Sequence, residues 1–393
     1  MAGLKNLNTG GEYLKSEIKI ILSLLAGLAL AASNHRSTMP AGYSIPVIDL
    51  SGQEHRQVVV DREAGQYLGH STTVLLADNR TMLAVYPKGH GRGAIVMKRS
   101  TDAGLTWSAR LPVPSSWSTS KETPTVFSIS NEQGKERLLL FSGLYPIRMS
   151  HSEDLGLTWT ELQPIGNFGG IVAMSSLLRL RNGDLMALFH DDGRFLKNRG
   201  LPGRFRVYQT ISHDFGLTWS HPVEIASHPK ARLCEPGALY SKDHRQIAVL
   251  LRENSRKFNS FVIFSEDDGK SWSSPRELPA ALTGDRHVAR YVPDGRLFIT
   301  FRDTARESRT RGDWVGWVGT YEDIVSGREG QYRVRLMKNF QAADCGYAGL
   351  EVLPDGTLVA TSYGHWLAGE QPFIVSVRFR LDEIDRLAGG SQK

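Results

Sequence analysis

The stretch Ser100-Thr101-Asp102-Ala103-Gly104-Leu105-Thr106-Trp107 determines the expected fold, because its pattern Ser-x-Asp-x-Gly-x-x-Trp occurs four times in the chain. The other copies run over residues 152–159, 212–219 and 265–272, and all four copies match at Ser, Asp, Gly and Trp. A pattern that returns after 52, 60 and 53 residues predicts a repeat protein, with one supersecondary unit in each repeat.

Each copy follows an apolar extended run, such as residues 94–98 or 261–264, so we interpret it as a hairpin turn. The Ser and Asp side chains are suited to accept hydrogen bonds from turn N–H groups, the Gly allows a positive φ, and the Trp buries a large apolar face. If the aspartates of these turns were catalytic, the four equivalent turns would require four equivalent catalytic sites. We therefore interpret the four aspartates as structural.

The pattern is similar to the Asp-box, also called the BNR repeat, and the chain resembles the sialidase-like six-bladed β-propellers. The resemblance implies an all-β fold, a six-bladed β-propeller with Asp-box turns. Six units with an apolar strand, a polar turn and a second apolar strand agree with it; their strand pairs are 70–76 and 81–86, 124–127 and 138–141, 175–178 and 185–189, 235–239 and 247–251, 287–291 and 297–301, and 347–353 and 358–362.

The four clear Asp boxes fall in the first four units. The corresponding turns of the last two units carry only degenerate forms of the pattern. We expect one propeller domain over residues 34–393, with at most a terminal helical turn at 381–387. The 39 glycines and the apolar content of 40% suit many short strands and tight turns. The net charge of +6 is spread along the chain, so we expect an acidic glycan as partner and no nucleic acid.

Cys234 and Cys345 fall in units that we place on non-adjacent blades, so we expect free, buried thiols. The sequence contains no Cys-x-x-Cys, His-Glu-x-x-His, Walker or dinucleotide-binding pattern. We therefore expect no cofactor and no metal.

An apolar run at residues 20–32 follows Lys15 and Lys19 and contains the small-residue stretch Ala29-Leu30-Ala31. This length suits the core of a signal peptide better than a membrane span. We predict that residues 1–33 form a signal peptide or signal anchor, which implies a secreted or periplasmic protein with no membrane association beyond such an anchor. Glu12 and Glu17 lie before the apolar run, where a signal peptide is usually basic, so a signal anchor and a misassigned start codon both remain alternatives.

Equivalent strand ends of a propeller converge on the mouth of its central channel. The starts of the first strands carry His70, Glu122 or Thr123, Ser175, Glu235, His287 and Tyr347, and the ends of the second strands carry Lys88 with His90, Ser142, His190-Asp191-Asp192, Arg252-Glu253, Arg302-Asp303 and His365. Convergence of His, Arg, Tyr and carboxylate side chains is typical of a catalytic site.

The resemblance also extends to single residues. Residues 346–356 resemble the sialidase segment that carries a tyrosine nucleophile, which implies this role for Tyr347. Residues 234–252 resemble the blade that supplies its glutamate partner and an arginine for the substrate carboxylate, which implies Glu235 and Arg252. A neutral phenol that Glu235 deprotonates avoids repulsion from the carboxylate of a sialic acid.

A second carboxylate-binding arginine is expected at Arg302, with Arg290 or Arg286 as competitors. The family's arginine on the first blade is missing, since residues 67–71 read Tyr-Leu-Gly-His-Ser. The family's acid/base aspartate is also missing from residues 86–91, which leaves Asp191, Asp192 or a histidine such as His90 to protonate the leaving oxygen.

The leading hypothesis is a secreted exo-acting glycoside hydrolase of sialidase type that cleaves an α-ketosidically linked acidic sugar, sialic acid or a related ulosonic acid. Its expected catalytic residues are Tyr347, Glu235 and Asp191, and its expected substrate-binding residues are Arg252, Arg302, Arg290, His70, Lys88, His90, His190 and His365. Alternatives are a polysaccharide lyase acting on uronic-acid glycans, which the histidines favour, and a non-catalytic carbohydrate-binding propeller.

Overall fold

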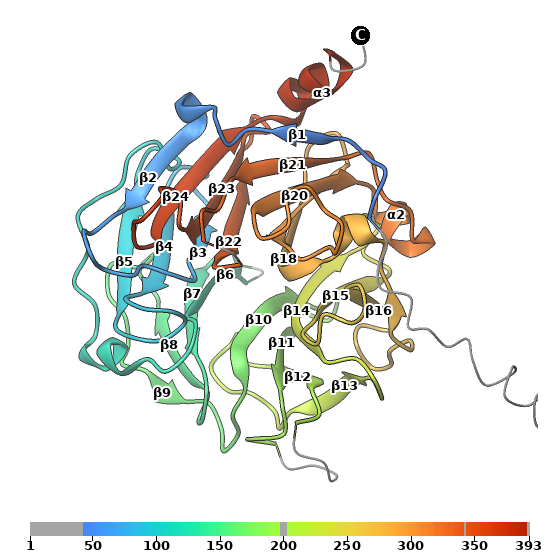
Figure 1. Ribbon diagram of the computed structural model, residues 1–393. Coiled ribbons are helices and arrows are strands. Elements are labelled where there is room, and N and C mark those ends of the chain that lie inside the picture. Colours follow the sequence, from blue (N-terminus) through green and yellow to red (C-terminus); the bar gives the residue numbers. More distant parts are fainter. Residues whose placement is uncertain (1–41, 132, 197–202, 342, 391–393) are drawn as a thin grey trace, which may run out of the picture. The chain divides into compact units, whose positions relative to one another are not determined.

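The computed structural model describes residues 42–131, 133–196, 203–341 and 343–390. These residues form a six-bladed β-propeller, which confirms the fold expected from the repeat (Figure 1). The predicted leader, residues 1–33, and the predicted domain boundary at residue 34 lie outside the described residues.

Each blade is built on three or four antiparallel strands that follow one another in sequence, and two blades gain a further strand from the start of the described chain. The first three blades contain β3 (Thr72–Leu75), β4 (Met82–Pro87) and β5 (Ile95–Ser100); β6 (Thr125–Ser130), β7 (Glu136–Ser142), β8 (Arg148–Ser152) and β9 (Gln163–Pro164); and β10 (Ile171–Arg179), β11 (Leu185–Asp191), β12 (Arg206–Ser212) and β13 (Val223–Ser227). All three contain the strand pairs expected from the sequence.

The last three blades have four, five and four strands, and two strands from the start of the described chain join the fifth and sixth blades. They contain β14 (Leu233–Tyr240), β15 (Ile247–Glu253), β16 (Phe261–Ser265) and β17 (Arg276–Glu277); β18 (Gly284–Tyr291), β19 (Leu297–Asp303), β20 (Trp314–Gly319), β21 (Tyr332–Met337) and β1 (Val47–Asp49); and β22 (Cys345–Val352), β23 (Leu358–Gly364), β24 (Phe373–Phe379) and β2 (Gln57–Asp61). Again the predicted strand pairs are confirmed.

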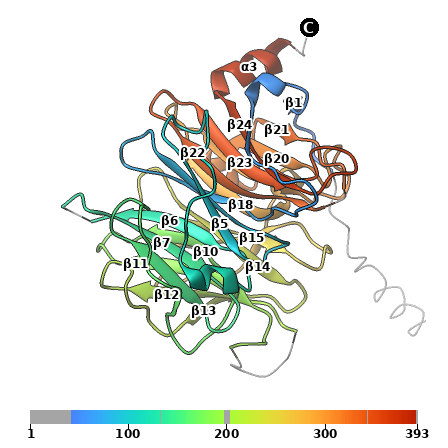
Figure 2. The ribbon, with the colours of Figure 1, turned by 90° about the vertical axis from the view of Figure 1, so that its left-hand side faces the viewer.

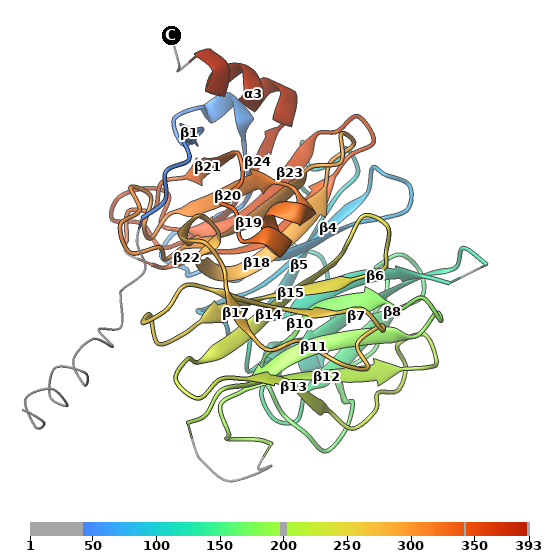
Figure 3. The same cartoon turned by 90° about the vertical axis from the view of Figure 1, so that its right-hand side faces the viewer.

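The ring closes through β1 and β2, which the sequence analysis did not foresee. β2 pairs antiparallel with β24 (Figure 1), and β1 pairs parallel with β21 (Figure 3), so the first part of the described chain lies in the last two blades. The innermost strands β3, β6, β10, β14, β18 and β22 each contact the next around the ring, and β22 contacts β3. Closure protects strand edges that an open stack of sheets would expose.

Helices are few in the described part of the chain. α2 (Tyr321–Ser326) starts with a capping box between Thr320 and Asp323, and α3 (Leu381–Gly390) lies beside β1 (Figure 2), which confirms the expected terminal helical turn. The remaining helical turns are the short 3-10 helices η1 (Glu54–Arg56), η2 (Ser115–Thr119) and η3 (Ala280–Leu282). No helix within the described ranges is long and apolar enough to span a membrane.

The core is divided into apolar layers between neighbouring blades. One such layer packs the Phe141 ring of the second blade edge-on against Trp219 at the border of the third, with a centroid distance of 5.6 Å. Another surrounds Trp317, which is fully buried and donates from its indole N–H to the carbonyl of Glu329 at 2.6 Å. Because each layer is shared by two sheets, every blade depends on its neighbours for burial.

The four repeated turns have the expected geometry. In the turn after β16, the Ser265 hydroxyl lies 2.9 Å from the carboxylate of Asp267 and accepts a hydrogen bond from the Gly269 N–H at 2.8 Å. Gly269 has a φ of 80°, where a Cβ would also approach the sulfur of Met186 to 2.8 Å. The turns after β5, β8 and β12 repeat these contacts, which supports a structural role for the four aspartates.

Both cysteines are buried and free, on the fourth and sixth blades. This confirms the expectation of unpaired thiols on non-adjacent blades. Burial raises the pKa of both thiols, so they remain protonated.

Three innermost strands begin with the same bulge, and these bulges place the candidate site. The register of β14, β18 and β22 shifts within 234–237, 285–288 and 345–348. The second residue of each bulge has a positive φ, which is 48° at Glu235, 57° at Arg286 and 91° at Gly346. A β-bulge changes the direction of side chains at a strand end, so the equivalent bulges orient groups from three neighbouring blades.

We predict that Asp267→Ala lowers the free energy of unfolding by about 1 kcal/mol, because Asp267 accepts hydrogen bonds from the Ser271 N–H and hydroxyl at 2.9 and 2.6 Å. Lys270→Ala in the same turn is the control and should change stability little. Hydrogen bonding lowers the pKa of Asp267 to about 2, so its contribution is present above pH 4 and is lost as the pH falls toward 2. Urea unfolding of both variants at neutral and acidic pH measures this difference; equal effects of the two substitutions would contradict it.

Candidate active site

A pocket of about 300 Å³ opens where the innermost strands begin. It brings together six of the predicted site residues: His70, His90, His190, Glu235, Arg252 and Tyr347. These residues come from four blades, so their convergence follows from the ring and could not arise within one repeat. The aspartates of the four repeated turns do not line this pocket.

Tyr347, Glu235 and Arg252 form the centre of the pocket. The Tyr347 hydroxyl donates a hydrogen bond to Oε1 of Glu235, and Nη1 of Arg252 donates to the same carboxylate oxygen. The same guanidinium nitrogen lies 3.1 Å from the Tyr347 oxygen. A phenol thus contacts both a carboxylate base and a cation.

Burial raises the pKa of Tyr347 well above its ordinary value, and the charge of Glu235 raises it further, while Arg252 and Arg302 oppose this shift. The tyrosine is therefore neutral in the free protein. A carboxylate that accepts a hydrogen bond from a phenol is placed to take the phenol proton if the phenol oxygen forms a bond to another atom.

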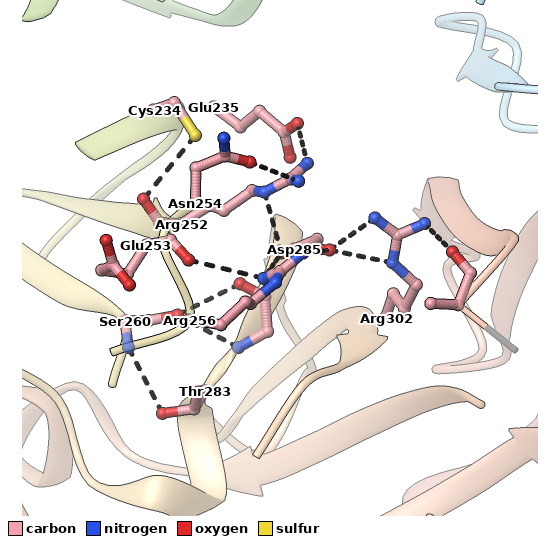
Figure 4. A network of polar contacts seen from close by, with 12 residues as sticks. Cys234, Glu235, Arg252, Glu253, Asn254, Arg256, Ser260, Thr283, Asp285 and Arg302 are labelled. Carbon is pink, nitrogen blue, oxygen red and sulfur yellow. Dashed lines mark hydrogen bonds and ion pairs between the residues drawn. The ribbon is translucent and has the colours of Figure 1, made fainter. Parts of the chain in front are cut away.

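The Asp285 carboxylate positions Arg252 (Figure 4). Asp285 is fully buried at the start of β18 and pairs with three guanidinium groups: Arg252 at 3.0 Å, Arg256 at 2.6 Å and Arg302 at 2.5 Å. The three cations hold the pKa of Asp285 far below its usual range despite burial, so the carboxylate is ionised. Sequence reasoning missed Asp285, although it occupies the same bulge position as Cys234 and Cys345.

The structure does not bring Arg302 or Arg290 to the pocket, which corrects their expected placement. Arg302 is buried behind Tyr347, where it pairs with Asp285 and donates to the carbonyl of Ala343. Arg290 lies further along β18, and its guanidinium is 3.9 Å from Glu351. Arg302 supports the site through Asp285 and lies over the Tyr347 ring, whereas Arg290 lines a separate cavity in the channel.

His70 and His190 are buried in the pocket wall. The His70 ring lies 4.3 Å from the Tyr347 ring and stacks on Tyr363. Burial lowers the pKa of His70 well below its usual value and lowers that of His190 to about 3. Both imidazoles are therefore neutral at physiological pH and can donate or accept hydrogen bonds without adding charge.

His90 is the exposed histidine of the pocket, with 64% of its side chain accessible. Its Nδ1 lies 3.2 Å from Asp344, which also accepts from the Tyr67 hydroxyl at 2.7 Å and contacts His365 at 3.1 Å. His365 lines a neighbouring cavity with Tyr67 and Asp344, so its expected place in the pocket is wrong. These hydrogen bonds hold the pKa of Asp344 far below its usual range.

The expected acid, Asp191, is fully buried and does not line the pocket. Its carboxylate accepts hydrogen bonds from the N–H groups of Gly193 and Leu196 at 2.9 and 3.1 Å, so it fixes the loop after β11. Asp192 does line the pocket and pairs with Arg194 at 2.8 Å. Lys88 also lies outside the pocket, because it pairs with Glu63 at 3.1 Å.

Glu122 is a carboxyl group of the pocket to which the sequence alone assigned no role. It precedes β6, lines the pocket, and accepts hydrogen bonds from the N–H and hydroxyl of Thr123 at 2.9 and 3.0 Å. Burial raises its pKa, and the nearby Glu235 charge adds to this. Its position at a predicted strand start was visible in the sequence, but its protonation depends on burial, which the sequence does not show.

No group of three or more His, Cys, Asp or Glu side chains in the described segments has the geometry of a metal site. The carboxylates of the pocket are instead paired with arginines or hydroxyls.

Comparison with known proteins shows the fold but no family. No protein-family model matches the sequence. A search of curated proteins also finds no match. A protein of unknown function from Dyadobacter fermentans is similar in structure with a TM-score of 0.67, at 14% identity, over 82% of this chain and 97% of that chain.

Sialidases have the same architecture. NanB sialidase from Streptococcus pneumoniae gives a TM-score of 0.57 at 13% identity, over 85% of this chain and 73% of that chain. The intramolecular trans-sialidase from Ruminococcus gnavus gives 0.54 at 13% identity, over 81% of this chain and 95% of that chain. The chain therefore has the sialidase-like propeller fold.

We predict that Asp285→Asn destabilises the protein by about 3–5 kcal/mol, because it leaves buried guanidinium groups without their carboxylate. The control is Asp49→Asn, which removes an exposed carboxylate 2.6 Å from Arg335 and should cost less than about 1 kcal/mol. Urea unfolding of the two variants tests this comparison. An Asp285→Asn variant as stable as Asp49→Asn would show that the three arginines do not depend on the carboxylate.

Proposed function

We propose that the protein is a secreted or periplasmic glycoside hydrolase that removes a terminal, α-ketosidically linked acidic sugar, sialic acid or a related ulosonic acid. The observation that carries this proposal is the hydrogen bond between Tyr347 and Glu235 in a pocket that also presents Arg252. The sialidase-like fold of the chain supports it.

In the proposed first step, the Tyr347 oxygen attacks the anomeric carbon while Glu235 takes the phenol proton. The bond from that carbon to the leaving oxygen breaks, and an acid gives the leaving oxygen its proton. In the second step, water attacks the anomeric carbon, the conjugate base of the acid takes a proton from that water, and Tyr347 leaves and recovers its proton from Glu235.

Glu122 is the best candidate for the acid. Glu122 and Glu235 line the same pocket in different environments, since Glu235 accepts a hydrogen bond from Arg252 while burial raises the pKa of Glu122 and favours its neutral form. Such a division between two carboxyl groups is how an enzyme obtains both a base and an acid near neutral pH. Asp191 does not suit this role, because it ends β11 and its carboxylate accepts hydrogen bonds from N–H groups of the loop that follows.

Arg252 is the guanidinium group of the pocket lining that is closest to Tyr347, at 3.1 Å, and favours a substrate with a carboxylate at the anomeric carbon. The two neutral histidines, His70 and His190, suit hydroxyl or amide groups of the sugar. The pocket therefore suits a sugar with one negative charge and several polar substituents.

Replacing Tyr347 with Phe should reduce kcat on a fluorogenic α-ketoside of sialic acid by at least about 10³-fold, since the nucleophile is lost while the ring remains. Glu235→Gln should reduce kcat by about 10²–10⁴-fold through loss of the base. The control is Lys88→Met, which lies outside the pocket and should retain the wild-type rate. Undiminished turnover by Tyr347→Phe would refute the assignment, provided that its unfolding curve matches the wild type.

Glu122→Gln should affect substrates according to their leaving group. An aryl ketoside with an acidic phenol needs little proton donation, whereas a sugar–sugar linkage needs it fully, so the variant should lose far more activity on the second. Because its pKa is raised, Glu122 stays protonated at pH values at which an ordinary carboxylic acid has already lost its proton. Wild-type activity on the sugar–sugar linkage should therefore fall as the pH rises through the pKa of Glu122. An equal loss on both substrates would exclude Glu122 as the acid.

A second candidate activity is β-elimination on a uronic-acid polysaccharide, which the convergence of His70, His90 and His190 near Tyr347 favours. An imidazole or phenolate would remove the proton next to the carboxylate, and Arg252 would stabilise the resulting charge. Ultraviolet absorbance of an unsaturated product separates this activity from hydrolysis, which produces none.

A further inference from the structure

Arg286 is a buried cation to which the proposed reaction assigns no role. It occupies the bulge at the start of β18, in the position that Glu235 occupies in β14, and only 3% of its surface is exposed. Its Nε and Nη1 are buried and have no hydrogen-bond partner, and no carboxylate lies within ion-pair distance of its guanidinium in the described part of the chain.

The neighbouring arginines differ from Arg286 in this respect. Arg252, Arg256 and Arg302 all pair with Asp285, the residue directly before Arg286. The bulge separates the two adjacent side chains, so that Asp285 serves three arginines and none of its contacts reaches Arg286. A buried charge without a partner costs several kcal/mol, which makes a partner from solution favourable.

Arg286 lines a cavity of about 340 Å³ in the central channel. Its polar wall includes Thr73, Ser128, Ser175 and His287, and the His287 Nδ1 is another buried atom without a partner. This volume is large enough for a small ion together with several water molecules. The cavity and the candidate active-site pocket share no lining residue within the described ranges.

The charges facing this cavity favour an anion. Arg286 and Arg290 are its cations, and Glu351 is its carboxyl group. Glu351 accepts a hydrogen bond from Thr73 at 3.0 Å, and burial raises its pKa, which favours its neutral form. The charge of Arg286 also acts across the wall between the two cavities, on Glu235, Tyr347, His70 and His190 of the candidate active site, whereas Glu351 does not act on Arg286.

We propose that Arg286 binds a small monovalent anion, a halide or a simple carboxylate, in the central channel, at a site separate from the sugar pocket. Arg286 supplies N–H donors to the anion, and the hydroxyls of the innermost strands complete the polar surroundings. The assignment does not depend on the proposed glycosidase activity.

The test measures the melting temperature of the full chain against chloride, with gluconate replacing chloride at constant ionic strength. Gluconate serves as the reference anion because it is too large to fit a site for a small anion. The wild type should show a saturable rise in Tm with chloride, and acetate should give the same behaviour. Arg286→Met should abolish the dependence, whereas the control Arg290→Met, half-exposed in the same channel, should retain it.

The gluconate condition adds a second readout. Arg286→Met removes an unpaired buried charge, so without chloride it should be at least as stable as the wild type, whereas loss of a merely structural arginine would destabilise the protein. A crystal of the wild type soaked in bromide should show an anomalous peak beside the Arg286 guanidinium, and this measurement does not require a folded variant.

A chloride dependence that persists in Arg286→Met, or a bromide-soaked crystal without a peak at Arg286, would overturn the proposal. N-acetylneuraminic acid is the second ligand. Its stabilising effect should survive in Arg286→Met, and its loss there would contradict two separate sites. If that sugar fails to stabilise even the wild type, the proposed function is affected while the chloride result still decides the anion site.

Discussion

The Asp285 carboxylate connects the fourth and fifth blades through charge. It lies fully buried at the start of β18 and pairs with Arg252 and Arg256 of the fourth blade and with Arg302 of its own blade. A buried carboxylate is costly without a cation, and the buried Arg302 guanidinium is costly without this carboxylate. Arg252 reaches Tyr347 and Glu235 from this anchored position, and Arg302 lies over the Tyr347 ring.

Differences in burial and in neighbouring charges give chemically similar side chains of the pocket different properties. Glu235 accepts from Arg252 and from Tyr347, while Glu122 in the same pocket is favoured in its neutral form by burial. His70 and His190 are kept neutral by burial in the same way. The pocket therefore combines two carboxyl groups in different environments, a cation and neutral hydrogen-bonding groups, and the proposed transfer of an acidic sugar to a phenol and then to water uses each of them.

The strands and turns could be predicted from the sequence because their signals are local. Alternating apolar residues fix the strand pairs, and the Ser, Asp and Gly of each repeated turn make their contacts within five residues. The direction of side chains at strand ends is not local. It depends on the bulges, where a positive φ at Glu235, Arg286 or Gly346 redirects the chain. Pairing β1 and β2 with the last two blades likewise depends on closing the ring.

The wrong placements have the same physical origin. Asp191 accepts a hydrogen bond from the loop after β11, and Lys88 forms an ion pair with Glu63. His365 pairs with Asp344, and Arg302 forms an ion pair with Asp285. Each has the residue type that a carbohydrate site uses, but the partner decides whether it faces the pocket. Glu122 was at an expected strand end, and only its burial reveals it as a candidate acid.

The central claim is that the Tyr347 oxygen forms a bond to the sugar. The most direct measurement is mass spectrometry of the intact protein after reaction with a fluorinated sialyl fluoride, whose second fluorine slows release of the intermediate. The account predicts that the mass rises by one sugar residue and that fragmentation places the added mass on Tyr347. An unmodified protein that nevertheless turns over the reagent, or an adduct on a different residue, would contradict it.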